Sequence, residues 1–300
     1  MPVMLADILE ILNPQPGQTV VDCTLGFGGH AVELLKRVGP TGKLIALDLD
    51  PDNLARAVPK LEAVGHPFVA AHANFAGLAG VLAAHGVSQV HGLLADLGMS
   101  SMQVDDPARG FSFLRDGPLD MRMDRSRGKT AAELLNTLSQ SDLAAAFRDL
   151  GDEPEAEAIA AAIVAERTKG PFERTSQLRA VVERAAPVKV VRSPGQGPAR
   201  KQQLLPATRV FQALRILVNR ELANLQSLLR TLPAVLAPGG VAAIISFHSG
   251  EDRLVKAAFR EGIQTGVYTT VSDDPVRPSD AEKLANPRSR SAKVRWCRRA

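Results

Sequence analysis

Short apolar runs alternate with helix-like segments through the first third of the chain. Val20-Val21, Leu44–Leu47 and Val90–Ala95 are mostly apolar, which is typical of strands buried on both faces of a parallel sheet. The segments between them have the length and periodicity of helices. The rhythm from Thr19 to Asp96 therefore predicts the first half of a doubly wound, Rossmann-like α/β domain.

The rhythm stops after Gln103, and about a hundred helical and charged residues follow without a strand-like run. Ser141 is expected to cap the second of the helices there. Residues 188–201 combine Pro, Gly and basic side chains and predict a flexible loop, for which a solvated linker and a nucleic-acid contact are equal interpretations. We expect an inserted, mainly helical substrate-recognition domain at residues 105–205. Its predicted helices are 130–138, 141–150 and 155–168.

Sheet-type sequence returns after a long amphipathic helix, predicted over Thr208–Leu232 with an apolar stripe that indicates core. An apolar strand at Val241–Phe247 follows, and then a helix. Two more segments are expected to close the sheet, Val267–Val271 and Lys293–Trp296. This predicts a discontinuous cofactor domain, with no internal repeat, formed by residues 1–104 and 206–300.

The segment Val20–His30 is the strongest chemical signal, because an apolar run is followed there by three glycines, Gly26, Gly28 and Gly29. Glycines let backbone approach a ligand, and the helix expected from about Ala31 would present free N–H groups to it. About eighteen residues beyond His30, a second strand ends in Asp48, a carboxylate able to hold two ribose hydroxyls. The pattern predicts a nucleotide-type cofactor site.

The residues of this turn favour S-adenosylmethionine over the alternatives. No Gly-Lys-Ser/Thr ending is present, which disfavours a phosphate-binding loop, and the glycines depart from the Gly-x-Gly-x-x-Gly spacing. Asp22 stands at the head of the turn, where it would repel a pyrophosphate but accept from an ammonium group.

Further acids follow strands of the predicted sheet. Asp96 ends an apolar run and precedes a Gly/Ser loop, so Asp22, Asp48 and Asp96 are expected to converge at the carboxyl edge of a parallel sheet. Phe75 is placed to lie against a flat base, although a core aromatic under a loop is the better interpretation of that residue alone.

Composition limits the class of protein. The chain has 300 residues, 45% hydrophobic content and 36 Lys and Arg against 32 Asp and Glu, which predicts a folded protein with a modest basic excess. Cys23 and Cys297 are too few for a disulfide framework or a metal site, so we expect no metal. Free thiols also predict a location in the reducing cytoplasm. Neither a membrane span nor a signal peptide is expected. A homodimer is left open.

A series of unusual motifs runs in order along nearly the whole chain: Asp22–His30, Asp96–Gln103, Arg109–Phe113, Gly117–Met123, Pro206–Gln212, Ile245–Ser249 and Asn286–Ser291. Together they resemble one known family, the 16S ribosomal RNA cytosine-N4 methyltransferases (RsmH, also called MraW). The resemblance implies a class I S-adenosylmethionine-dependent methyltransferase that methylates the exocyclic N4 amine of a cytosine in the ribosomal decoding region. The small ribosomal subunit and its 16S rRNA are the implied partners. By the same resemblance, the cofactor contacts are Gly28, Gly29, His30, Asp48, Phe75, Asp96 and Gln103.

Two positions depart from the family pattern. The family usually has a His and a Thr or Pro ahead of its Val-Met/Leu-Leu stretch, whereas this chain opens at Met1–Leu5, so we expect a short amino end that lacks a segment helping to close the site. Gly250 stands where the family tends to carry Leu, and a glycine would weaken the start of the next helix by roughly 1 kcal/mol.

The substrate side of the site is less defined. Ser246 and His248, beside Phe247 at the end of a strand, are candidates for gripping the target base, and a structural role for His248 is an equal alternative. The proton acceptor is not assigned. RNA would be held by the basic carboxyl end, with Arg288, Arg290 and Arg295 as candidates.

A second basic segment follows the cofactor loop, and we expect the insert and the carboxyl end to form the two walls of an RNA cleft. The cations of this basic segment are Arg109, Arg115, Arg122, Arg125 and Arg127. Three other functions compete with this interpretation: a nicotinamide-dependent oxidoreductase, an RNA-binding assembly factor without catalysis, and a DNA or protein methyltransferase. The last is weakened because Asp96-Leu97-Gly98-Met99 stands in place of Asp/Asn-Pro-Pro-Tyr.

Overall fold

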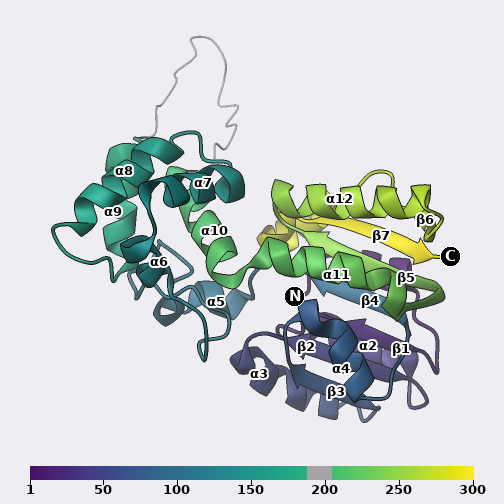
Figure 1. Ribbon diagram of the computed structural model, residues 1–300. Helices are drawn as coiled ribbons and strands as arrows, with labels where there is room; N and C mark the ends of the chain where they lie inside the picture. The colour runs from purple at the N-terminus through teal and green to yellow at the C-terminus, as the bar shows by residue number, and fades with distance from the viewer. Residues whose placement is uncertain (188–204) are drawn as a thin grey trace. The chain divides into compact units, whose positions relative to one another are not determined.

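The computed structural model describes residues 1–187 and 205–300 (Figure 1). They form two compact units, the first made of residues 1–100 and 222–300 and the second of residues 101–221. The first unit is therefore discontinuous, and the second is inserted in it along the chain. The loop expected at residues 188–201 lies outside the described residues.

The first unit is built on a seven-stranded sheet in the order β3-β2-β1-β4-β5-β7-β6. The pairs from β3 to β5 are parallel, and β7 is antiparallel to both of its neighbours. This topology confirms the predicted doubly wound class. The strands are β1 (Thr19–Asp22), β2 (Lys43–Asp48), β3 (Phe68–His72), β4 (Val90–Asp96), β5 (Leu236–Ser246), β6 (Tyr268–Val271) and β7 (Lys293–Arg299).

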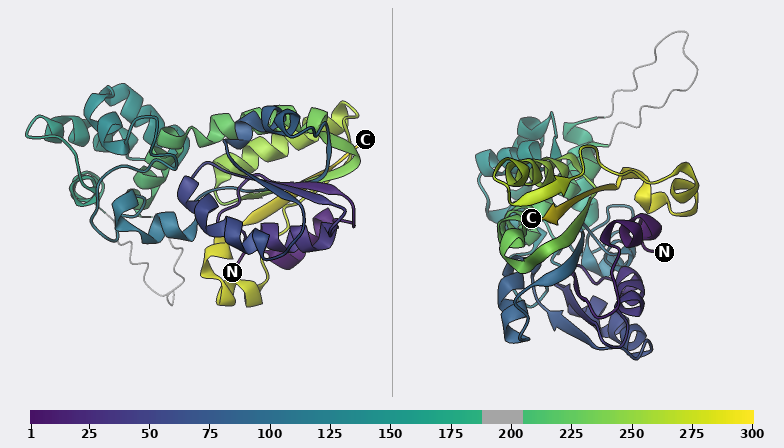
Figure 2. Two further views of the ribbon diagram at one scale, coloured as in Figure 1. Left: turned by 90° about the horizontal axis from the view of Figure 1, so that it is seen from below. Right: turned by 90° about the vertical axis from the view of Figure 1, so that its right-hand side faces the viewer.

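Alternating side chains of these strands supply two cores, one on each face of the sheet. Val21 and Ile244 belong to one cluster, whereas their neighbours Val20 and Ile245 belong to the other. A strand buried on both faces needs an apolar residue at every position, which explains the continuous apolar runs. Helices cover both faces (Figure 2). On one face lie α4 (Leu78–Ala84), α11 (Glu221–Val235) and α12 (Ser249–Gln264), and on the other α1 (Leu5–Leu12), α2 (Gly29–Val38) and α3 (Pro51–Glu62). A short helix, α13 (Asp280–Ala285), precedes β7.

The second unit is helical around its own core, which includes Phe147, Ile159 and Phe211. The cap of its second predicted helix is Ser139 rather than Ser141, because the Ser139 side chain accepts the hydrogen bond from the Asp142 amide. Its helices are α5 (Ser101–Asp105), α6 (Ala131–Thr137), α7 (Gln140–Gly151), α8 (Ala156–Arg167), α9 (Thr175–Ala185) and α10 (Pro206–Asn219). The sequence did not predict α9.

The single helix expected over Thr208–Leu232 is wrong. Arg220 has a φ of 52° and ends α10, after which α11 begins. A left-handed residue breaks an α-helix, so the apolar stripe is divided: Leu214 packs in the core of the second unit and Leu225 in the core of the first. Residues 206–221 therefore belong to the second unit, which corrects the predicted boundary at residue 206.

Among the described residues, no helix is long and apolar enough to cross a membrane. A cytoplasmic location and a homodimer stay predictions.

Substitution of two helical glycines, Gly262 and Gly80, tests the packing of the first unit. A Cβ on Gly262 of α12 would lie 2.1 Å from the ring of Tyr268, whereas a Cβ on Gly80 of α4 would meet nothing within 4 Å. We expect Gly262→Ala to lower the free energy of unfolding by about 1–3 kcal/mol through overpacking. The matched change Gly80→Ala should raise it by about 0.5–1 kcal/mol, because alanine favours the helix. Urea unfolding measures both, and stabilisation by both changes would contradict the described contact.

Candidate active site

The glycine turn between β1 and α2 adopts a backbone that most side chains would not. Gly26 and Gly28 have φ values of 51° and 76°, and Gly28 is the N-cap residue of α2. A Cβ on Gly28 would approach Ala57 to 3.2 Å. Glycine is therefore needed for both conformation and space. The turn places the start of α2 at the carboxyl edge of the sheet, where its N–H groups lack helical partners.

Asp48, at the end of β2, holds this turn in place. Its Oδ2 accepts from the Gly26 amide at 2.7 Å, its Oδ1 accepts from the Asp50 amide at 2.8 Å, and the Asn53 side chain donates to both oxygens at 3.2 Å. A carboxylate offers about four acceptor positions. The protein itself engages Asp48 fully in this structure, and its ribose contact stays a prediction.

The structure brings the three strand-end acids together, as the sequence predicts. Burial raises the pKa of Asp22 to about 7. The hydrogen bond from the Thr24 amide lowers this pKa in part, and the charge of Asp48 raises it. Burial also raises the pKa of Asp96 well above its usual range, and the charges of Asp22 and Glu251 add to this. Acids that repel one another in this way share one poorly solvated region.

His30 extends the acid cluster from α2. Its Nε2 lies 2.9 Å from the Val3 carbonyl oxygen, which can only accept, so Nε2 carries the proton. Burial lowers the pKa of His30 and favours the neutral ring, although the hydrogen bond to Val3 raises this pKa in part. The Nδ1 atom is then an acceptor, and it faces Asp96 Oδ2 at 3.8 Å.

When Asp96 is ionised, two acceptors face each other here. The Asp96 side chain is 24% exposed, yet its Oδ1 is buried and has no hydrogen-bond partner in the described structure. An unpaired buried acceptor is costly unless a ligand supplies the donor. This cluster therefore fits a group that carries cationic N–H donors, such as the ammonium of an amino acid.

Glu251, which the sequence interpretation missed, organises the end of β5. It is 2% exposed, and its Oε2 accepts from the amides of Phe247 and His248 at 2.8 and 3.4 Å. The signal for it was a capping box, in which the residue three places after the N-cap residue is Glu. His248 is that N-cap residue.

The two base-gripping candidates differ in their surroundings. Ser246 is 1% exposed and its hydroxyl donates to the Lys293 carbonyl of β7 at 3.3 Å, so its contact with the base stays a prediction. The His248 ring is 9% exposed, with Nε2 3.3 Å from Glu251 Oε1. A Cβ on Gly250 would lie 3.2 Å from that ring, so the glycine makes room for it.

Phe75 and Gln103 lie in different units. Phe75 follows β3 in a 3-10 turn (Phe75–Gly77) and packs partly against the first unit's core. Gln103 is 2% exposed on α5 of the second unit. The structure therefore gathers Gly28, Gly29, His30, Asp48 and Asp96 within the first unit, and the cofactor contacts of these residues, of Phe75 and of Gln103 stay predictions.

The basic residues of the carboxyl end differ in exposure. Arg288 and Arg290 are exposed in a 3-10 turn (Pro287–Ser291), consistent with access to RNA. Arg295 is only 4% exposed, and its guanidinium donates to Asp252 Oδ1 at 2.6 Å. This buried ion pair holds β7 against α12, which corrects the prediction that Arg295 contacts RNA.

The fold and site define a methylase with a Rossmann-like sheet. The family model for the "MraW methylase family" matches residues 1–300, and the chain belongs to that family. The predicted methyltransferase class and its methyl donor, S-adenosylmethionine, are thereby confirmed.

Two relatives match this chain over most of their own length. The chain is 45% identical to a protein of Sorangium cellulosum, covering 99% of this chain and 90% of the relative. It is 44% identical to one of Syntrophotalea carbinolica, covering 99% and 96%. Both are named ribosomal RNA small subunit methyltransferase H. A solved structure of a putative rRNA-methylase from Clostridium thermocellum is similar at a TM-score of 0.46 with 10% identity, covering 100% of this chain and 97% of that chain.

The raised pKa of Asp22 predicts how stability depends on pH. Between about pH 4 and 7 the unfolded carboxyl is ionised while the folded one keeps its proton, so stability of the ligand-free protein falls as pH rises through this window. The difference amounts to at most about 4 kcal/mol. We expect Asp22→Asn to flatten the fall, measured by thermal unfolding from pH 4 to 8, whereas Glu33→Gln on the surface should not. An unchanged slope in Asp22→Asn would refute this account.

Proposed function

We propose that this protein transfers the methyl group of S-adenosylmethionine to the N4 amine of a cytosine in the decoding region of 16S rRNA, in the small ribosomal subunit. The observation that carries the proposal is the match to one methylase family along residues 1–300. Relatives at 45% and 44% identity are named as small-subunit rRNA methyltransferases. The motifs of the chain resemble the enzymes that act on cytosine N4.

The acid cluster supports the orientation of the cofactor. S-adenosylmethionine supplies a sulfonium methyl group and carries an ammonium group at the other end of its amino-acid part. Asp96 Oδ1 and His30 Nδ1 are acceptors at the carboxyl edge of the sheet, where ligands of such folds bind. We assign them to the ammonium, with the Gly28 turn close to the rest of the cofactor.

The target base must come out of its stack. A cytosine in a duplex is out of reach, so unstacking costs a few kcal/mol. The end of β5 would receive the base: Glu251 fixes the backbone of Phe247 and His248. A Cβ on Gly98 would lie 3.5 and 4.0 Å from two atoms of the Phe247 ring, so Gly98 lies beside that ring. Aligning the amine nitrogen with the sulfonium methyl is the main task, after which the amine loses one proton.

RNA contact beyond the base is assigned to exposed cations. Arg288 and Arg290 in the first unit are exposed and suit phosphate contacts, which depend on salt. We assign substrate recognition to the second unit as well.

Asp96→Asn tests the cofactor assignment. The amide keeps the shape of the side chain but loses the negative charge, so we expect S-adenosylmethionine to bind about tenfold to a hundredfold more weakly, the range of a hydrogen bond to a charged group. Calorimetry measures this, with Asp149→Asn as the matched control, because the Asp149 side chain on α7 is exposed. Equal affinity of Asp96→Asn and the unchanged protein would remove Asp96 from the ammonium site.

Transfer of labelled methyl to small ribosomal subunits that lack the modification tests the function as a whole. Nuclease digestion and mass spectrometry then locate the methylated nucleoside. We expect N4-methylated cytidine in the decoding region. Methyl transfer to another nucleoside would replace the substrate assignment, and cofactor binding without any transfer to subunits would overturn it.

A further inference from the structure

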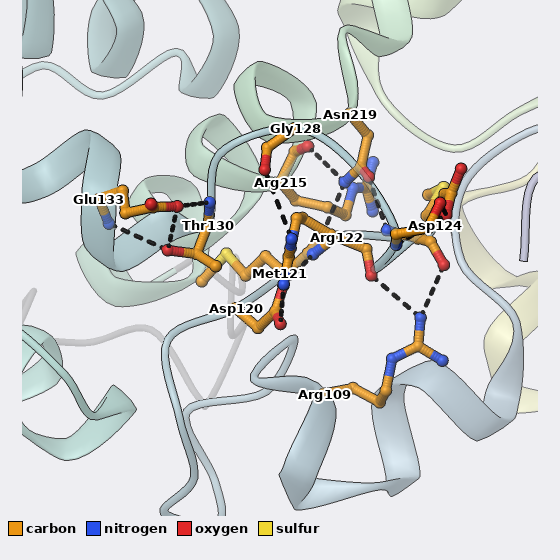
Figure 3. A network of polar contacts seen from close by, with 12 residues as sticks. Arg109, Asp120, Met121, Arg122, Asp124, Gly128, Thr130, Glu133, Arg215 and Asn219 are labelled. Atoms are coloured by element: carbon orange, nitrogen blue, oxygen red, sulfur yellow. Dashed lines mark hydrogen bonds and ion pairs between the residues drawn. The ribbon is translucent and has the colours of Figure 1, made fainter.

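A short segment of the second unit, Met121–Met123, has a hydrogen bond at every backbone polar group (Figure 3). The Met121 amide donates to the Arg109 carbonyl at 3.0 Å, and its carbonyl accepts from Asn219 Nδ2 at 2.8 Å. The Arg122 amide donates to Asp120 Oδ1 at 3.1 Å. Such saturation is typical of a strand inside a sheet, yet this segment belongs to none.

Two side chains replace the missing strands. The Arg109 guanidinium, on a residue that is 4% exposed, donates to the carbonyls of Arg122 and Met123, each at 3.0 Å. Asn219, at the end of α10, accepts from the Met123 amide at 2.8 Å with the same side chain that donates to Met121. Arg109 and Asn219 thus clamp the segment from two directions.

The clamp maintains a strained backbone. Met121 is fully buried and has a φ of 62°, a conformation that L-residues with long side chains rarely adopt. Strain of this kind persists only where surrounding contacts over-determine it, and it is found mainly at functional sites. The strain at Met121 therefore indicates that the clamped segment has a functional role in addition to packing.

The residues that follow are fixed at both ends. Asp124, 6% exposed, accepts from the Ser126 amide and hydroxyl at 3.0 and 2.6 Å and from Arg127 Nε at 2.7 Å. On the other side, Thr130 and Glu133 form a capping box that begins α6. Residues 125–129 form an exposed tip between these two anchors. We call residues 125–129 the cationic tip.

The cationic tip has a local excess of basic side chains. It carries Arg125, Arg127 and Lys129 with no acid and no apolar side chain, and the Arg127 side chain is 65% exposed. Arg127 pairs with Asp124 at 2.7 Å, just as exposed cations on the helices pair with acids: Arg148 with Glu157 at 2.8 Å, and Lys169 with Glu166 at 3.2 Å. Such pairs largely cancel their own fields. Even with Asp124 included, the tip keeps a net positive charge.

We propose that the cationic tip is a preorganised contact for the phosphate backbone of RNA, with Arg109 and Asn219 as positioning residues. The proposal rests on the proposed function, since it assumes an RNA substrate. A tip held in one conformation loses little entropy on binding. Because it has no aromatic ring to stack on a base, it would fix the register of the RNA rather than read its sequence.

The decisive variant combines Arg125→Gln, Arg127→Gln and Lys129→Gln in the full chain. Binding to a naked decoding-region RNA hairpin, and to small subunits, is measured against salt concentration, with S-adenosylmethionine affinity as the folding control. Three lost phosphate contacts should reduce the slope of log K against log salt by about 2–3, at about 0.7–0.9 per contact. RNA affinity should fall at least about tenfold at low salt, and cofactor affinity should not change.

The matched control is the triple variant Arg148→Gln, Lys169→Gln and Arg184→Gln, which removes as many exposed cations from the same unit. Its salt slope should stay unchanged. An unchanged slope in the tip variant, or an equal loss in the control, would overturn the proposal. Weaker binding to subunits with unchanged binding to naked RNA would also overturn it, in favour of an acidic protein partner.

The outcomes separate this proposal from the proposed function. If the tip variant binds RNA weakly but the enzyme does not methylate cytosine N4, the tip stands and the function fails. If N4 methylation is found and the tip variant binds RNA normally, the function stands and the tip proposal fails.

Asn219→Asp tests the positioning role. The carboxylate cannot donate to the Met121 carbonyl, so the clamp should loosen while all three cations remain. We expect faster tryptic cleavage after Arg125, Arg127 or Lys129 and a severalfold loss of RNA affinity at an unchanged salt slope and cofactor affinity. Faster cleavage without loss of RNA affinity would reduce Asn219 to a structural residue.

Discussion

Burial of carboxylates at the carboxyl edge of β1, β2 and β4 is the constraint on which the first unit depends. A buried ion is costly unless donors surround it, and the protein supplies donors to these acids unequally. Asp48 receives four contacts, including the Gly26 amide, so the left-handed turn and the acid are mutually required. Asp96 keeps a buried oxygen without a donor. The contrast separates an acid that builds the site from one that is left for a ligand.

Much of the first unit could be predicted from sequence because its signals are local. A strand covered on both faces must be apolar at consecutive positions, and Val20-Val21 and Leu93-Leu94 show this without knowledge of their partners. Glycines at positive φ mark the turn for a similar reason. The convergence of Asp22, Asp48 and Asp96 followed from the topology alone, since parallel strands end at one edge.

The errors arose where periodicity and charge do not distinguish environments. Helical spacing of apolar residues continues across Arg220, so a left-handed break there leaves no trace in the pattern. Arg288 and Arg295 look equivalent as basic residues in the sequence, yet one is exposed and the other pairs with Asp252 in the interior. Glu251 was hidden because a capping acid and a site acid have the same sequence signature. The partner of Arg295 lies 43 residues away in sequence, and the role of Glu251 depends on its burial.

The discontinuity of the first unit also bears on how the chain folds as it is made. β4 pairs with β5 through residues as distant as Leu93 and Ala242, and the whole second unit is synthesised between them. Until β5 emerges, one edge of β4 has no partner, and unpaired edges invite aggregation. The second unit has a core of its own, so it is able to fold during this interval. Early compaction of the insert would shorten the distance between the two halves of the sheet and reduce the entropy lost on closing that loop.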